Sequence, residues 1–76
     1  MERQIAVQKM IGNRIREHRR RRGWSQEQLG NLCSIHRSHM GAIERGESNL
    51  TLSTLLAISA KLEMKVAALL YRADQG

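Results

Sequence analysis

The chain has no proline and no phenylalanine, and only one cysteine, one tryptophan and one tyrosine among its 76 residues. Without proline, helices are not interrupted, and the abundance of leucine, isoleucine, alanine, methionine and arginine favours an all-α domain. A single cysteine excludes an internal disulfide and fits a cytoplasmic protein. No apolar run reaches the roughly 18 residues that a membrane span requires, and the charged first residues do not form a signal peptide.

Negative charge is also scarce, since seven acidic residues face thirteen lysines and arginines, giving a net charge of +6. Residues 1–23 hold eight basic and two acidic side chains, so the whole excess lies in this first segment. Clustered arginine in a chain with a pI of about 10.8 is typical of proteins that bind polyanions. Binding to an anionic membrane is the competing interpretation, but no wide apolar face accompanies the arginines.

The stretch 24–46 predicts two short helices joined by a tight turn. Ser25 and Gln28 have the spacing of a capping box at the start of the first helix. Apolar residues then recur at i, i+3 and i+4, which places them on one face of a helix. These residues are Leu29, Leu32 and Cys33.

A second helix is expected at about 36–45, after the pattern breaks at Ser34 and Ile35. Met40 and Ile43 face inward, and Gly46 is a stop signal. The side chains between the apolar positions face outward, namely His36, Arg37, Ser38, His39 and Ala42. Two helices joined in this way form a helix-turn-helix, whose second helix can enter the DNA major groove.

Residues 11–70 resemble the XRE/Cro-type helix-turn-helix family, the DNA-binding domains of phage repressors and small bacterial regulators. The residues that carry the resemblance are Ile15, Arg16, Arg19, Trp24, Ser25, Gln26, Leu29, Ile35, Met40, Ile43, Glu44, Arg45, Gly46, Thr51, Leu52 and Leu55. The run 44–51 also resembles the controller proteins of restriction–modification systems. The resemblance implies a compact five-helix domain like that of lambda repressor, with the helix-turn-helix at its centre.

The expected helices span about 5–22, 26–33, 37–45, 52–62 and 66–72, within a DNA-binding domain of residues 9–72. Residues 1–8 extend the first helix, and residues 73–76 form a frayed tail. Gly12 destabilises the first helix by about 1 kcal/mol relative to alanine, and we therefore expect this helix to fray before Gly12. The first helix buries Val7, Ile11 and Ile15, and the fourth buries Leu52, Leu55, Leu56, Ile58 and Leu62.

The start of a helix in the major groove presents its side chains to base edges. Arg37 can bond the O6 and N7 of guanine, which discriminates by about 1–3 kcal/mol. Ser38 can bond a base or a phosphate, Ala42 can touch a thymine methyl, and His39 serves either the groove or the packing. Candidates for phosphate contact are Gln26, as in the family, together with His36, Arg45, Ser48 and Asn49.

The resemblance further implies a buried ion pair between Arg19 and Glu44. The chain departs from the family at Ser34 and Glu63, where glycine is usual, and Ser34 is expected to be strained by about 1 kcal/mol. Gly30 replaces the usual alanine and permits a close approach of the two helices. Gly41 replaces a serine, which removes a phosphate-contacting hydroxyl from the second helix.

Metal binding and catalysis find little support. Cys33, His36 and His39 have a spacing that could suggest zinc, but no fourth ligand is evident, and Cys33 is expected in the core. The only aspartate is Asp74, in the tail, and no set of nucleophile, base and orienting group is visible. The sequence therefore predicts a non-enzyme without metal, cofactor or small-molecule substrate.

The favoured function is a sequence-specific transcriptional regulator that binds double-stranded DNA as a homodimer and associates with the nucleoid. Such a dimer reads half-sites about 34 Å apart, so a near-palindromic operator is expected. Leu69, Leu70 and Tyr71 are candidates for the dimer interface, unless the leucines merely close the core. The alternative is an antitoxin or adaptor that uses the same fold to bind a protein partner.

Overall fold

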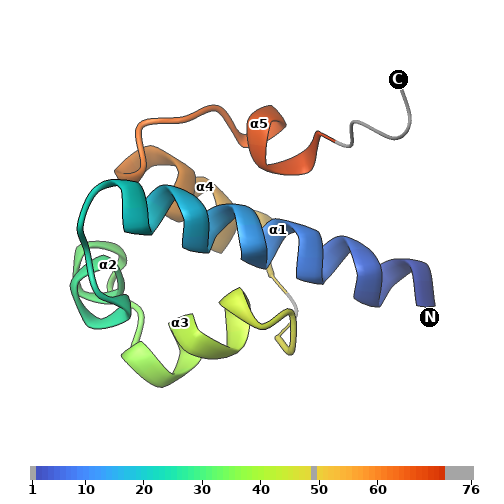
Figure 1. Cartoon of the computed structure of the whole chain (residues 1–76), viewed down its shortest axis with the longest axis horizontal. Coiled ribbons are helices and arrows are strands. Elements are labelled where there is room, and N and C mark those ends of the chain that lie inside the picture. The colour runs from blue at the N-terminus through green and yellow to red at the C-terminus, as the bar shows by residue number, and fades with distance from the viewer. Residues whose placement is uncertain (1, 49, 72–76) are drawn as a thin grey trace.

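The computed structural model describes residues 2–48 and 50–71, and within these ranges the chain forms five helices and no strand. They are α1 (Glu2–Arg21), α2 (Gln26–Cys33), α3 (Arg37–Glu44), α4 (Leu52–Lys61) and α5 (Val66–Leu70). Figure 1 shows α1 along the length of the molecule, with α3 and α5 on opposite sides of it. The predicted all-α, five-helix fold is therefore confirmed. None of these helices is long and apolar enough to cross a membrane.

The boundaries differ from the predicted ones mainly at the two ends. α1 begins at Glu2 and continues without a break, so residues 2–8 are one helix with the rest of α1. α5 ends at Leu70 and not at residue 72 as predicted, because Tyr71 after it has extended backbone. Residue 72 and the predicted tail 73–76 lie outside the described residues.

All five helices contribute to one hydrophobic core. The predicted inward residues Ile11 and Ile15 of α1 and Met40 and Ile43 of α3 are buried there. Val7 is half-buried at the edge of the core. The remaining buried apolar side chains are Leu29, Leu55, Ile58, Leu62 and Leu69.

Leu52 and Leu56, which were expected in the core, lie on the surface instead, as does Leu32 of the predicted apolar face of α2. Leu32 is 45% exposed, Leu56 is 50% exposed and Leu52 is 67% exposed. α4 buries positions 55, 58 and 59, and the residue that follows it, Leu62, is also buried. Leu56 projects about 100° away from Leu55 around the helix. Leu52 opens α4 beyond the end of the core. The prediction was wrong because each short helix buries a narrower face than its apolar content suggests.

Local hydrogen bonds fix where α2 and α4 begin. Ser25 Oγ accepts from the Gln28 amide at 3.0 Å, and Gln28 Oε1 accepts from the Ser25 amide at 2.7 Å. The predicted capping box is therefore present. Thr51 caps α4 with one such bond, since its Oγ1 accepts from the Thr54 amide at 3.1 Å.

Ser34 ends α2, and Glu63 follows α4. Both residues have left-handed backbone, with φ of 57° at Ser34 and 55° at Glu63. These are the positions where the family usually has glycine. A side chain in this region costs about 1 kcal/mol or more. The backbone nevertheless adopts the turn because α2 and α3 are held on both sides of it by the core.

Two glycines mark places where backbones meet. A Cβ at Gly12 would lie 2.5 Å from the carbonyl oxygens of both Ile43 and Glu44, and a Cβ at Gly30 would lie 2.4 Å from the Ile35 carbonyl oxygen. Gly12 therefore marks where α1 crosses the end of α3, and α1 does not fray before it. Gly30 provides the close approach that the sequence predicted.

Candidate nucleic-acid interface

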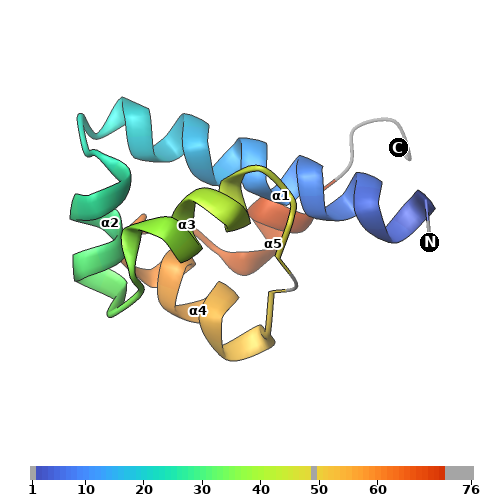
Figure 2. The ribbon, with the colours of Figure 1, turned by 90° about the horizontal axis from the view of Figure 1, so that it is seen from below.

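α2, the turn at residues 34–36 and α3 form the predicted helix-turn-helix. The Ile35 amide donates to the Gly30 carbonyl oxygen at 2.8 Å, which ties the turn back to α2. Met40 and Ile43 on the inner side of α3 are at most 1% exposed, whereas the opposite side faces solvent. In Figure 2 α3 lies in front of α1 and α5. Among the predicted outward residues Ala42 is half-buried, and the others are exposed, namely His36, Arg37, Ser38 and His39.

His36 caps α3, a role that the sequence analysis missed. Its Nδ1 accepts from the Ser38 amide at 3.1 Å and lies 2.7 Å from Ser38 Oγ. Histidine is not among the preferred N-cap residues, so its position gave no clear signal. The cap uses one ring nitrogen and orders the start of α3, where bases would be read.

Arg37 pairs across the turn with Glu27 of α2, at 3.2 Å between Nη1 and Oε2. Both side chains are exposed, by 68% and 59%, so the pair contributes about 0.2–1 kcal/mol at most. Sequence reasoning missed Glu27, because the spacing of ten residues has no meaning until the turn brings the two helices together. A pair this weak does not fix the Arg37 side chain against Glu27.

The loop after α3 is tied to α3 itself. His39 Nε2 lies 3.2 Å from Ser48 Oγ, and Arg45 Nε lies 3.1 Å from Glu47 Oε1. His39 and Ser48 therefore share one surface, whereas Asn49 lies outside the described residues. These contacts place Arg45 and Ser48 beside the exposed side of α3.

Glu44 is the buried polar centre of the site, and it joins three helices. Arg19 Nε donates to Glu44 Oε2 at 2.7 Å, and Arg19 Nη2 donates to Oε1 at 2.9 Å. The predicted pair is thus brought together, and both side chains are at most 9% exposed. Arg19 also donates to the Trp24 carbonyl oxygen at 2.8 Å.

Two further side chains reach Glu44, which the sequence did not reveal. Gln26 Nε2 donates to Glu44 Oε1 at 3.2 Å, and Arg16 Nη2 donates to the Glu44 carbonyl oxygen at 3.1 Å. Gln26 is the first residue of α2 and a predicted phosphate contact. Its side chain is therefore positioned from within the protein by the end of α3.

The basic first segment divides into structural and exposed arginines. Arg14 donates to the Ala68 and Leu69 carbonyl oxygens at 3.2 and 3.3 Å. Arg22 donates to the Leu62 carbonyl oxygen at 2.9 Å and lies over the Trp24 ring at 5.3 Å. Arg20 and Arg21 are exposed. Part of the positive charge therefore braces the fold, and part remains available for a polyanion.

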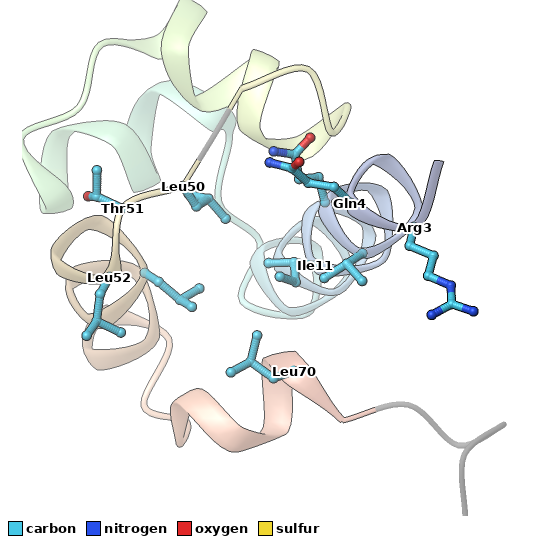
Figure 3. Close-up of a pocket in the computed structure, with 10 residues that line it drawn as sticks. Arg3, Gln4, Ile11, Leu50, Thr51, Leu52 and Leu70 are labelled. Carbon is cyan, nitrogen blue, oxygen red and sulfur yellow. The ribbon is translucent and has the colours of Figure 1, made fainter. Parts of the chain in front are cut away.

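The three candidates for the dimer interface do not form one surface. Leu69 is fully buried and closes the core, so its assignment to an interface was wrong. Leu70 and Tyr71 are 45% and 61% exposed. Leu70 also borders an apolar groove of about 620 Å³ between α1, α5 and the start of α4 (Figure 3), where Ile11, Leu50 and Leu70 point toward the same space.

Cys33 is half-buried against α4 rather than enclosed in the core, with Sγ 3.9 Å from the Ala57 carbonyl oxygen. Burial raises the pKa of its thiol, and nearby Lys61 opposes this in part. Within the described ranges, no three histidine, cysteine or acidic side chains gather to hold a metal ion.

Comparison with known proteins places this arrangement in a family. Residues 11–70 match the model of the helix-turn-helix domain family. The control protein C.SmaI of Serratia marcescens is 36% identical over 66 residues, which are 87% of this chain and 79% of that protein. The transcriptional regulator SinR of Bacillus subtilis is 34% identical over 62 residues, and this chain spans 56% of its length.

Solved structures agree with the sequence matches. The restriction–modification controller protein C.AhdI of Aeromonas hydrophila has a TM-score of 0.81 and 36% identity, over 84% of this chain and 97% of that one. A SinR structure in complex with DNA has a TM-score of 0.76 and 32% identity, over 80% and 98% of the two chains. The chain therefore belongs to the helix-turn-helix domain family, as its resemblance to XRE/Cro-type proteins predicted.

Proposed function

We propose that the protein is a transcriptional regulator that binds double-stranded DNA in a sequence-specific way, and that it is not an enzyme. The observation that carries the proposal is the division of α3, whose inner side is sealed in the core while Arg37, Ser38 and His39 face solvent. This is the arrangement that lets a helix lie in the major groove. The DNA complex of SinR, a protein of the same fold, supports it.

Base reading is assigned to the exposed side of α3. Arg37 stands at the first position of α3 and exchanges Glu27 for the O6 and N7 of guanine. Ser38 and His39 follow on the exposed surface and meet the next base edges. Ala42 is half-buried at the middle of the helix, where its methyl group can contact a thymine methyl.

Phosphate contacts flank this reading surface. Gln26 at the start of α2 is held by Glu44, and the positive end of the α2 dipole also favours an anion there. His36 has its Nε2 for a phosphate, because Nδ1 caps α3. Arg45 and Ser48 supply contacts on the other side, and Asn49, which lies outside the described residues, is proposed as a phosphate contact from the sequence alone. These groups fix the register of the protein on the duplex without reading sequence.

A homodimer is proposed as the DNA-bound species, acting in the cytoplasm on a near-palindromic operator. Leu70 and Tyr71 remain exposed at the end of α5, and Leu52 lies exposed at the start of α4 beside the same groove. Covering such apolar side chains with a second copy removes them from water. A domain of this size gains stability from the added burial.

Selection of bound sequences from a random duplex pool tests the function directly. Arg37→Ala should relax the preference at one base position, whereas Gln26→Ala should weaken binding to every sequence alike. Lys65→Ala serves as a control, because Lys65 is exposed before α5 and its side chain makes no capping hydrogen bond. The affinity of the parent protein should fall steeply with added salt.

Two results would contradict the proposal. Failure of the folded parent to bind any duplex at low ionic strength would favour the antitoxin or adaptor alternative. An unchanged base preference in Arg37→Ala would remove Arg37 as the base-reading residue.

A further inference from the structure

Gly46, the second residue after α3, lies directly against α1 at Lys9. A Cβ built on Gly46 would lie 2.5 Å from Lys9 Cγ and 2.8 Å from Lys9 Cα. The backbone of this turn therefore touches both the helix and the side-chain stem of the lysine. Figures 1 and 2 show the turn after α3 against α1 in two views. Lys9 thus lies at the same turn as Arg45 and Ser48, which are proposed above as phosphate contacts.

Lys9 is exposed although its stem touches this turn. A lysine in such a position lays its methylene groups along the surface of the protein and keeps its ammonium group in water. The ammonium group extends beyond Cγ on a flexible chain, so it can reach groups that lie past the turn. Lys9 therefore adds a positive charge at the edge of the surface formed by α3 and the turn.

The charge of Lys9 has no counterion in the part of the chain that the structure describes. Within residues 2–48 and 50–71, Lys9 forms no ion pair. The acidic residue of the turn, Glu47, pairs with Arg45 instead, at 3.1 Å. The residues three and four positions from Lys9 along α1 are uncharged, namely Ile5, Ala6, Gly12 and Asn13. The helix itself therefore offers Lys9 no acidic partner.

We propose that Lys9 binds a phosphate of the DNA backbone, beside the phosphate contacts of Arg45 and Ser48. A lysine ammonium attracts a phosphate as a point charge, and such a contact carries no base preference. The contact adds α1 to the elements that hold the duplex. This inference rests on the proposed DNA binding and extends it to a residue outside the helix-turn-helix.

A purely structural role for Lys9 makes a different prediction. Lys9 lies beside the C-terminal end of α3, where a positive charge stabilises a helix through its dipole. Loss of that interaction lowers the melting temperature of the free protein, but it does not change the number of phosphates that the protein neutralises. The melting temperature and the salt dependence of DNA binding therefore separate the two roles.

The test compares Lys9→Gln and Lys9→Arg with Lys61→Gln, a control that removes the same charge from an exposed position at the end of α4. The melting temperature is measured by circular dichroism, and the Kd for a duplex selected from the random pool is measured over a range of salt concentrations. Lys9→Gln should weaken binding several-fold to every sequence alike and reduce the slope of log K against log salt by about one. Lys9→Arg, which keeps the charge, and Lys61→Gln should retain the parent slope, and all three variants should melt close to the parent temperature.

Acetylation of lysine side chains measures the contact without a substitution. The chain has three lysines, at positions 9, 61 and 65. The folded protein is treated with an acetylating reagent in the presence and absence of the duplex, and modification at each lysine is quantified by mass spectrometry. Acetylation of Lys9 should slow several-fold when the duplex is bound, whereas Lys61 should react at the same rate in both samples.

The outcomes distinguish this inference from the proposed function. A parent protein that binds no duplex refutes both. A parent that binds, with an unchanged salt slope in Lys9→Gln and no protection of Lys9 from acetylation, refutes only the role of Lys9. A lower melting temperature of Lys9→Gln with an unchanged salt slope assigns Lys9 to the stability of α3 and refutes the same role.

Discussion

Replacing Arg19 with alanine removes a buried arginine from the centre of the fold and leaves Glu44 behind. Arg19 donates two hydrogen bonds to the carboxylate, at 2.7 and 2.9 Å, and one to the Trp24 carbonyl oxygen at 2.8 Å. The Glu44 side chain is fully buried. The variant therefore leaves a carboxylate in the interior with only Gln26 and the more distant Arg16 nearby.

Removing one partner of a buried ion pair lowers the free energy of unfolding by about 3–5 kcal/mol. A domain of 76 residues has a total stability of about 4–11 kcal/mol, from about 0.05–0.15 kcal/mol per residue. At about 4–8 °C per kcal/mol, a loss of even 3 kcal/mol lowers the melting temperature by about 12 °C or more. The loss of one side chain should thus remove a large part of the stability of the domain.

Thermal and urea denaturation followed by far-ultraviolet circular dichroism measure this effect. Arg20→Ala is the matched control, because Arg20 is the adjacent arginine but is exposed. Replacing the pair together, with Arg19→Met and Glu44→Leu, should restore most of the stability, since no charge is then left buried. The reasoning is refuted if Arg19→Ala unfolds within about 1 kcal/mol of the parent.

Three further substitutions and the reactivity of Cys33 test other parts of the structure. Ser34→Gly should raise stability by about 1 kcal/mol in urea denaturation, because φ at this position is 57°; a loss would contradict the strain. Leu69→Ala should cost about 2–5 kcal/mol, whereas Leu70→Ala should cost far less and weaken self-association in sedimentation equilibrium. Burial raises the pKa of the Cys33 thiol, so its alkylation should be slower in the folded than in the urea-unfolded protein. For the same reason, the free energy of unfolding should fall as pH rises through the folded-state pKa of this thiol. Equal alkylation rates in the two states would contradict this.

Local signals in the sequence predicted the features that depend on neighbouring residues. The capping box at Ser25 and Gln28 and the inward positions Met40 and Ile43 follow from spacing within one helix, and all are present. Ser34 was expected to be strained, and its backbone is in the left-handed conformation. These predictions needed no knowledge of how the helices pack.

Features that depend on the packing of several helices could not be predicted in this way. Leu52 and Leu56 are as apolar as Leu55, and only the position of the neighbouring helices decides which of them is covered. The contacts of Glu27 with Arg37 and of Gln26 with Glu44 join residues ten and eighteen positions apart. Such pairs have no helical periodicity, so no pattern in one segment reveals them.

The crossing at Gly12 has a consequence for how DNA is selected. α3 touches α1 there through bare backbone, so α3 cannot tilt or slide without α1 colliding with the carbonyl groups of residues 43 and 44. A recognition helix held at a fixed angle cannot adjust to an irregular major groove. We therefore expect the duplex to supply the adjustment by bending or twisting, and operators rich in flexible pyrimidine–purine steps to be bound more tightly than stiff ones that carry the same contacted bases.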